Sequence, residues 1–266
     1  MKNLGQTRSS YQRTHLLQTP DTFVRAPLPG MKAANAVVHT GPALGAGFTQ
    51  YSAEFESGGE LGPALGERFL YVIEGAITVR KGKKSELLAA GDYAHVPEGT
   101  SHRVIASEKS RAAVIEKKYV PMPEVDPGSA LFGRENAITA VPLLGDPDLE
   151  VRQLLPEKAG YDYAVNTMLF RPGAALSMVE IHVMEHGLLM LEGGGIYRLD
   201  DNWYSVTAGD FIWMAPYCPQ WFAAVGKRPA KYLIYKDWNR HPFSRSATPT
   251  SRGGNDTANR SRTARS

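Results

Sequence analysis

The chain has little that would tie it to an oxidising compartment or to a membrane. Cys218 is its single cysteine in 266 residues, so no disulfide can form within the chain and an oxidising compartment is not implied. It has no run of about 18 apolar residues, and no short apolar segment follows Met1, so neither a membrane-spanning helix nor an export signal is expected. These absences predict a cytoplasmic protein with no membrane partner.

A strong charge of one sign is also missing. The formal net charge is +3 at pH 7, and residues 244–266 carry five arginines but only one acidic residue, Asp256. Serine, threonine, glycine and asparagine dominate this segment, a composition typical of a disordered, solvated tail. Because the rest of the chain is then nearly neutral, the charge predicts no nucleic-acid partner.

Short apolar segments separated by glycine or lysine turns run through most of the chain. They predict strands rather than helices, and therefore an all-β barrel or sandwich. Residues 1–45 are polar with scattered proline and glycine, and we expect them to form an arm laid over a barrel. The expected strands are 48–55, 68–73, 76–80, 85–89, 93–96, 112–116, 151–155 and 161–170.

The chain contains an internal repeat. The shift that carries Gly75 onto Gly193, 118 residues, also aligns 69–75 with 187–193 without a gap. Self-similarity of this kind predicts two tandem copies of one β-module. The predicted organisation is an arm at 1–45, a first barrel at 46–120, a Pro-, Gly- and Asp-rich connector at 121–150, a second barrel at 151–243 and a tail at 244–266.

A carboxylate, two imidazoles and an amide in the second copy are candidates for a metal site. Glu180 and His182 are two residues apart, so on a strand their side chains would leave the same face. His186 opens the next apolar run, and Gln220 follows a Pro-Tyr-Cys-Pro turn. Such a mixed oxygen and nitrogen set suits a six-coordinate divalent ion with positions left for substrate or water.

The first copy lacks most of these ligands. At the four equivalent positions it has Gly62, Ala64, Arg68 and His102. One possible ligand of four cannot hold a metal unaided, so we expect the first barrel to bind none.

Two other interpretations of the histidines compete with a barrel metal site. His182-Val-Met-Glu-His186 matches the H-x-x-E-H pattern of helical zinc peptidases, but the segment follows Arg171-Pro-Gly173 and ends at three glycines. Its apolar residues alternate with polar ones, which favours a strand. The other interpretation is that these histidines are surface or core residues without metal, as we expect for His39 and His95.

Two motifs carry a family resemblance. Gly91-x5-Pro97-x-Gly99-x2-His102 fits the second motif of the cupin superfamily, and Glu180-x-His182-x3-His186-x6-Gly193 occupies the frame of the first. The usual first-motif ligands are His, His and Glu, whereas here Glu comes first, and Gln220 stands where the second motif has His. With the strings at 67–75, 117–121, 199–203 and 236–240, this permuted set resembles the (S)-ureidoglycine aminohydrolase family over residues 45–240.

The resemblance implies a bicupin, two tandem jelly-roll barrels, that uses Mn²⁺ to convert ureidoglycine and water into (S)-ureidoglycolate and ammonia in purine and allantoin catabolism. It also implies a homo-oligomer larger than a dimer. By position, the metal ligands are Glu180, His182, His186 and Gln220, and the residues that face the substrate are Tyr197, Tyr232 and Lys236. Lys236 would hold the substrate carboxylate. Glu180 would also move a proton to the departing amine.

Two functions of other kinds remain open. A cupin dioxygenase would use Fe²⁺ with open positions for O₂. A metabolite-binding or storage-type bicupin would have no turnover. Metal content separates the binding protein from the two enzymes, and oxygen dependence separates the dioxygenase from the hydrolase.

Overall fold

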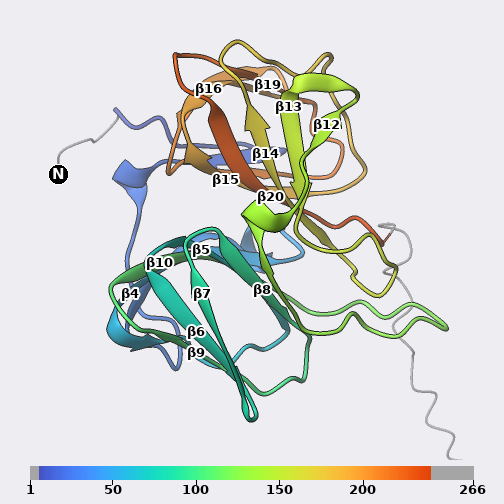
Figure 1. Cartoon of the computed structure of the whole chain (residues 1–266). Coiled ribbons are helices and arrows are strands. Elements are labelled where there is room, and N and C mark those ends of the chain that lie inside the picture. Colours follow the sequence, from blue (N-terminus) through green and yellow to red (C-terminus); the bar gives the residue numbers. More distant parts are fainter. Residues whose placement is uncertain (1–5, 241–266) are drawn as a thin grey trace, which may run out of the picture.

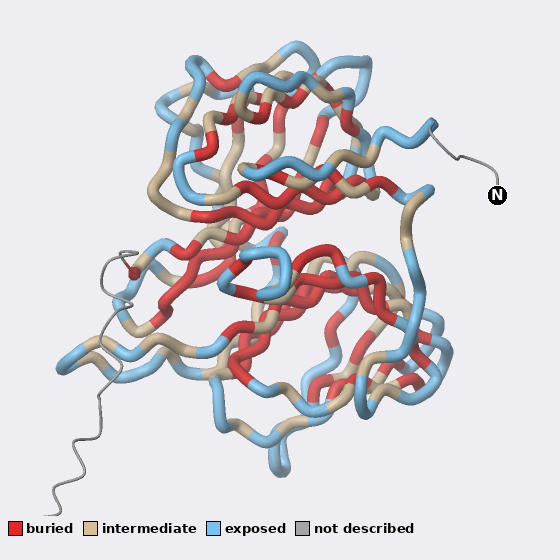
Figure 2. The backbone as a smooth tube through the Cα atoms, turned by 180° about the vertical axis from the view of Figure 1, so that it is seen from behind, coloured by how far each residue is buried: buried red, intermediate tan, exposed pale blue. Residues whose placement is uncertain are grey.

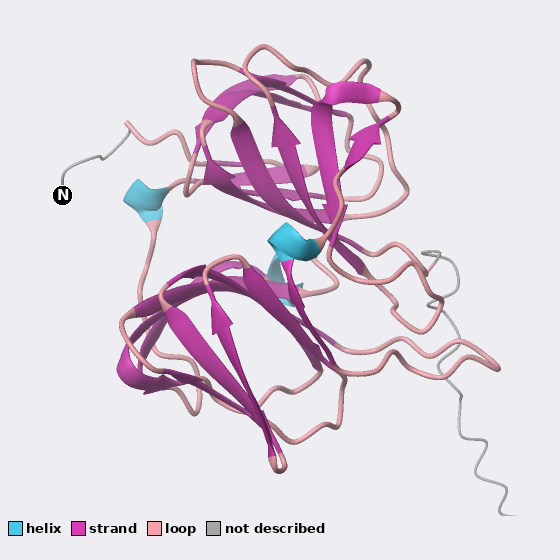
Figure 3. Ribbon diagram, viewed as in Figure 1, coloured by secondary structure: helices cyan, strands magenta, loops and turns pink. Residues whose placement is uncertain are grey.

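The computed structural model describes residues 6–240, and its regular secondary structure is almost all strand (Figure 3). The only helical elements in that range are three single 3-10 turns, η1 (Pro20–Thr22), η2 (Pro42–Leu44) and η3 (Glu135–Ala137). The all-β prediction is therefore confirmed. No helix in the described part of the chain is long and apolar enough to span a bilayer. The predicted tail at 244–266 lies outside the described residues.

Two barrels follow one another along the chain (Figure 1). The first has the sheet order β11-β8-β5-β10-β4-β9-β6-β7, and β3 pairs with β4. Its strands are β3 (Lys32–Thr40), β4 (Thr49–Glu60), β5 (Glu67–Glu74), β6 (Ala76–Lys81), β7 (Lys84–Ala89), β8 (Asp92–Val96), β9 (Arg103–Ala106), β10 (Ser110–Lys117) and β11 (Leu131–Arg134).

The second barrel combines an eight-stranded sheet, ordered β1-β2-β18-β15-β20-β14-β13-β12, with a three-stranded sheet, ordered β17-β16-β19. The strands of the larger sheet are β1 (Ser10–Tyr11), β2 (His15–Gln18), β12 (Val141–Leu143), β13 (Asp146–Gln153), β14 (Ala164–Phe170), β15 (His186–Glu192), β18 (Phe211–Met214) and β20 (Ala230–Lys236). The smaller sheet contains β16 (Gly194–Leu199), β17 (Asn202–Thr207) and β19 (Gln220–Ala224).

Alternate residues of the central strands face two different apolar cores. On β15, Leu188 and Met190 pack inside the second barrel, whereas Leu189 packs in the layer between the barrels. Because both faces are buried, the strand reads as a continuous apolar run rather than an alternating one. Figure 2 shows the buried backbone inside each barrel and in the layer between them.

Segments outside the two repeats complete both sheets. The expected arm contributes β2, which pairs with β18 of the second barrel, and β3, which pairs with β4 of the first. The connector contributes β11, paired with β8, and β12, paired with β13. The amino-terminal strand β2 therefore belongs to the sheet that carries the candidate site, although the whole first barrel lies between β2 and β18 in the sequence.

The repeated glycines form equivalent turns. Gly75 and Gly193 have positive φ angles of 75° and 63°, and each follows the central strand of its barrel. A Cβ at Gly193 would lie 2.3 Å from the Pro229 carbonyl oxygen, so only glycine fits there without a shift of the backbone. This shared requirement explains why the two copies align without a gap at this turn.

Polar groups are buried in the layer between the barrels. Lys117 of β10 forms an ion pair with Asp162, which precedes β14. His39 contacts Gln18 and Ser52 through its two ring nitrogens, and His95 contacts the Tyr163 hydroxyl. Both histidines are buried and hydrogen-bonded, which agrees with their interpretation as structural residues.

Candidate metal centre

Glu180 and Gln220 face each other across a single β-bridge at the mouth of the second barrel. The Glu180 amide donates to the Gln220 carbonyl at 2.8 Å, and the Gln220 amide donates back at 2.9 Å. The strand expected through 179–183 is wrong, since the chain pairs there only at Glu180, and Ile181 is 61% exposed. The bridge nevertheless fixes the carboxylate and the amide at one place.

His186 is the best-defined candidate ligand. It starts β15, opposite Met214 on one side and Lys236 on the other. Its Nδ1 donates to the Glu185 carbonyl at 2.8 Å, and its Nε2 is buried without a hydrogen-bond partner. Burial lowers the pKa of His186 well below its usual value, and nearby Lys236 and His182 lower it further. The ring is therefore neutral, with the Nε2 lone pair available to a metal.

His182 and Glu180 lie beside His186 and bond to each other. His182 Nε2 is 3.1 Å from Glu180 Oε2, and the rings of His182 and His186 have centroids 5.3 Å apart. In residues 6–240, no three His, Cys, Asp or Glu side chains are already arranged to enclose a metal ion. The donor types fit a divalent ion, but binding requires Glu180 and His182 to exchange their mutual hydrogen bond for bonds to the metal.

Gln220 and the two predicted tyrosines line the interior of the barrel. The Tyr197 hydroxyl donates to Gln220 Oε1 at 3.0 Å, which leaves that oxygen a second lone pair. The Tyr232 hydroxyl donates to the Met168 sulfur at 3.3 Å. Burial raises the pKa of both tyrosines above the usual value, so both remain protonated hydrogen-bond donors.

Lys236 supplies a positive charge next to these groups. It is the register partner of His186 on β20. Burial lowers the pKa of Lys236, and the carboxylates of Glu180 and Glu157 oppose that shift. Within residues 6–240 its side chain forms no hydrogen bond or salt bridge, so its ammonium group is available to an anionic ligand.

Glu185 is a residue that the sequence did not single out as functional. Both carboxylate oxygens accept from the Gly47 amide, at 2.9 and 3.1 Å, and one also accepts from Trp213 Nε1 at 3.3 Å. The carboxylate thus holds a first-barrel loop, while the Glu185 carbonyl orients His186. Since 182–186 is not helical, the peptidase interpretation is wrong. Nothing in the sequence indicates the structural role of Glu185, because Gly47, the residue that its carboxylate holds, is 138 residues away.

The equivalent place in the first barrel contains a guanidinium group. Arg68, which aligns with His186, donates to Glu116 at 2.8 Å and to the Gly62 carbonyl at 2.9 Å. Its Nη1 also lies 3.1 Å from His102 Nε2, the remaining potential ligand. A fixed cation thus occupies the position that corresponds to the candidate metal site. That the first barrel holds no metal stays a prediction, developed in the Discussion.

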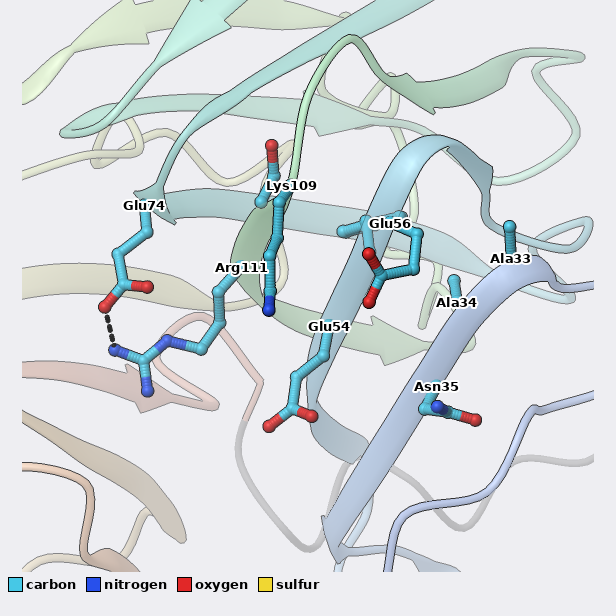
Figure 4. Close-up of a pocket in the computed structure, with 10 residues that line it drawn as sticks. Ala33, Ala34, Asn35, Glu54, Glu56, Glu74, Lys109 and Arg111 are labelled. Atoms are coloured by element: carbon cyan, nitrogen blue, oxygen red, sulfur yellow. Dashed lines mark hydrogen bonds and ion pairs between the residues drawn. The ribbon is translucent and has the colours of Figure 1, made fainter.

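A separate surface cavity of about 520 Å³ lies on the first barrel. Figure 4 shows side chains of both charges around it, with Arg111 bonded to Glu74 at 2.7 Å. None of the residues predicted as ligands or substrate contacts lines this cavity. It is therefore distinct from the candidate metal centre, whose residues all belong to the second barrel.

Comparison with known proteins defines the class of the chain. The cupin domain signature matches residues 53–116 and 166–235, one stretch in each barrel. The structure of protein Ylba from E. coli superposes with a TM-score of 0.79 and 31% identity, covering 88% of this chain and 95% of that one. The chain is a cupin with two barrels, as the fold and the site indicate.

Two curated relatives define the family more narrowly. The chain is 41% identical over 244 residues to (S)-ureidoglycine aminohydrolase from Arabidopsis thaliana, covering 90% of this chain and 80% of that protein. It is 33% identical over 231 residues to (S)-ureidoglycine aminohydrolase from Escherichia coli (strain K12), covering 84% and 88% respectively. The chain belongs to the (S)-ureidoglycine aminohydrolase family, and the resemblance found in its sequence is confirmed.

Proposed function

We propose that this protein is a Mn²⁺-dependent enzyme that hydrolyses (S)-ureidoglycine to (S)-ureidoglycolate and ammonia, in purine and allantoin catabolism. One observation carries the proposal: Lys236, whose charge has no hydrogen-bonded partner within residues 6–240, lies in register with His186, whose Nε2 is buried and unpartnered there. A cationic group and a free metal-ligand lone pair at one place suit a small carboxylate substrate. The curated relatives that bear this name support the same activity.

Four side chains would hold the metal: Glu180, His182, His186 and Gln220. They offer one carboxylate, two imidazoles and one amide oxygen, a set that suits a hard divalent ion such as Mn²⁺. The bound ion supplies positive charge and Lewis acidity at the substrate. The Nδ1 bond of His186 to the Glu185 carbonyl fixes the tautomer that ligation needs.

The reaction replaces the amine of the substrate by a hydroxyl. The carbon–nitrogen bond to the amine breaks, a bond to the oxygen of water forms, and ammonia leaves. Glu180 is 24% exposed at its side chain and lies next to His182, so it can take a proton from water and give one to the departing amine. Lys236 binds the carboxylate through a charge-assisted hydrogen bond. The buried hydroxyls of Tyr197 and Tyr232 orient the substrate, so that water reaches one face of the reacting carbon.

The test is ammonia release from freshly generated ureidoglycine. The substrate is made in situ from allantoate by an amidohydrolase, and the rate is compared for metal-free protein, Mn²⁺-loaded protein and Mn²⁺-loaded protein without oxygen. We expect release above the spontaneous rate only with metal, and equally with and without oxygen. Loss of activity under anaerobic conditions would favour the Fe²⁺ dioxygenase. Ligand binding without any turnover would favour a metabolite-binding cupin.

We also propose that the protein is a homo-oligomer larger than a dimer and acts in the cytoplasm. Large apolar side chains are exposed on the loops beside the site, including Met178, Ile181 and Tyr217. Such a patch is typical of surfaces that are covered in an assembly. Light scattering should give a mass several times 29.1 kDa, and a monomer at micromolar concentration would contradict this part of the proposal.

A further inference from the structure

A cavity of about 500 Å³ adjoins the candidate metal centre on the side of β12, β13 and β14. Lys236 and Met168 both line it, and the Met168 sulfur accepts a hydrogen bond from the Tyr232 hydroxyl at 3.3 Å. The cavity and the candidate site therefore share Lys236 and meet again at the Tyr232–Met168 contact. This volume falls within the range of pockets that bind small molecules.

Asn166 lines this cavity, and its side chain is partly buried. It lies on β14, in register with Gln153 on β13 and Ile234 on β20, and both amide residues line the cavity. Asn166 Oδ1 is buried without a hydrogen-bond partner, and the side chain forms no hydrogen bond within residues 6–240. Leaving a buried amide unpaired is costly. The lack of a partner within residues 6–240 therefore points to one that comes from outside the chain.

We propose that Asn166 is the recognition residue for the ureido end of the substrate, an inference that rests on the proposed function. A ureido group carries N–H donors and a carbonyl acceptor along one edge. The Asn166 amide offers one acceptor and two N–H donors, so the two groups complement each other in hydrogen bonds. With the carboxylate on Lys236, the ureido group extends from the shared residue into the cavity, where Gln153 provides a second amide.

This assignment separates the roles of two residues that line the same cavity. Lys236 recognises the carboxylate, which the product shares with simple 2-hydroxy acids. Asn166 recognises the ureido group, which those acids lack. Lys236 therefore contributes to affinity for both kinds of ligand, whereas Asn166 contributes to the preference between them.

The experiment measures binding of (S)-ureidoglycolate and of glycolate to the metal-loaded full chain by titration calorimetry. The variants are Asn166→Leu, close in size to asparagine but without polar atoms, and Asn166→Ala, which cannot clash if leucine does. Asn35→Leu, at an exposed position of β3 in the first barrel, is the matched control. Metal content and melting temperature are checked for each variant before titration.

We expect both Asn166 variants to weaken ureidoglycolate binding about 5- to 30-fold, the loss of one or two neutral hydrogen bonds. Glycolate binding should stay within about twofold, and Asn35→Leu should change neither. An unchanged preference for ureidoglycolate in both Asn166 variants would overturn this inference alone. A wild-type protein that binds neither ligand would overturn the proposed function and, with it, the inference.

Discussion

Replacing Arg68 with methionine removes the guanidinium group from the interior of the first barrel while keeping most of its apolar stem. The side chain of Arg68 is 4% exposed, and that of its partner Glu116 is 22% exposed. Glu116 would lose its cation, and Tyr51, which donates to the same carboxylate at 2.9 Å, would be left beside an uncompensated charge. The Gly62 carbonyl would lose its donor as well.

Breaking a buried ion pair from one side costs about 3–5 kcal/mol. Because Glu116 keeps some contact with water, we expect the lower end, about 3 kcal/mol. The double variant Arg68→Met, Glu116→Gln should be less destabilised than Arg68→Met, since it removes the unpaired charge. Metal bound by the second barrel should be unchanged in both variants.

Hydrogen exchange followed by mass spectrometry reports on the two barrels separately. Peptides from β4, β5 and β10 should lose protection in Arg68→Met, and peptides from β15 and β20 should keep theirs. Urea unfolding followed by circular dichroism gives the free energy of unfolding of each variant. Unchanged protection in the first barrel would refute the view that Arg68 is its structural cation in place of a metal.

Three further predictions concern the site and the layer between the barrels. His182→Ala should remove most bound Mn²⁺, because loss of a direct ligand lowers metal affinity by at least the roughly 10- to 100-fold that is typical of outer-shell changes. His102→Ala should leave the metal content unchanged. Metal analysis that showed the reverse would place the metal site in the first barrel. Glu185→Ala should lower kcat more than it raises KM, since the Gly47 amide and Trp213 Nε1 lose the carboxylate that anchors the backbone next to His186. An unaltered kcat would show that Glu185 is not a positioning residue. Burial lowers the pKa of His39 to about 3. Between pH 7 and 5 this histidine therefore binds a proton in the unfolded state, near pH 6.5, but not in the folded state. The free energy of unfolding consequently falls as the pH falls. The wild type should therefore lose about 2 kcal/mol more than His39→Gln over that interval, and equal losses in urea titrations would contradict the prediction.

The repeat made much of the fold predictable. Two copies of one β-module give two barrels, and the glycines at 75 and 193 mark the same left-handed turn in each. The four ligand positions could be compared between copies for the same reason. Glu180 and His182 did come together as their two-residue spacing suggested, although through one β-bridge rather than a strand.

The features that could not be predicted from the sequence depend on contacts between distant residues. The His15–Gln18 segment lies in the part expected to be a polar arm, and nothing local indicates that it pairs with β18, which lies beyond the whole first barrel. The partner of such a short strand is set by tertiary packing, not by its own periodicity. The role proposed for Asn166 could not be predicted from the sequence either. It depends on the absence of a hydrogen-bond partner within residues 6–240, which is apparent only when β13, β14 and β20 are assembled.

The enantiomeric composition of the product tests the central claim most directly. Spontaneous loss of ammonia from ureidoglycine gives racemic ureidoglycolate, so chirality distinguishes catalysis from background more sharply than rate does. In the proposed site, Tyr197, Tyr232 and Lys236 would hold the reacting carbon in one orientation, so the Mn²⁺-loaded protein should give the S enantiomer in large excess. Racemic product, formed at the background rate in the presence of fully metal-loaded protein, would contradict the proposed hydrolysis.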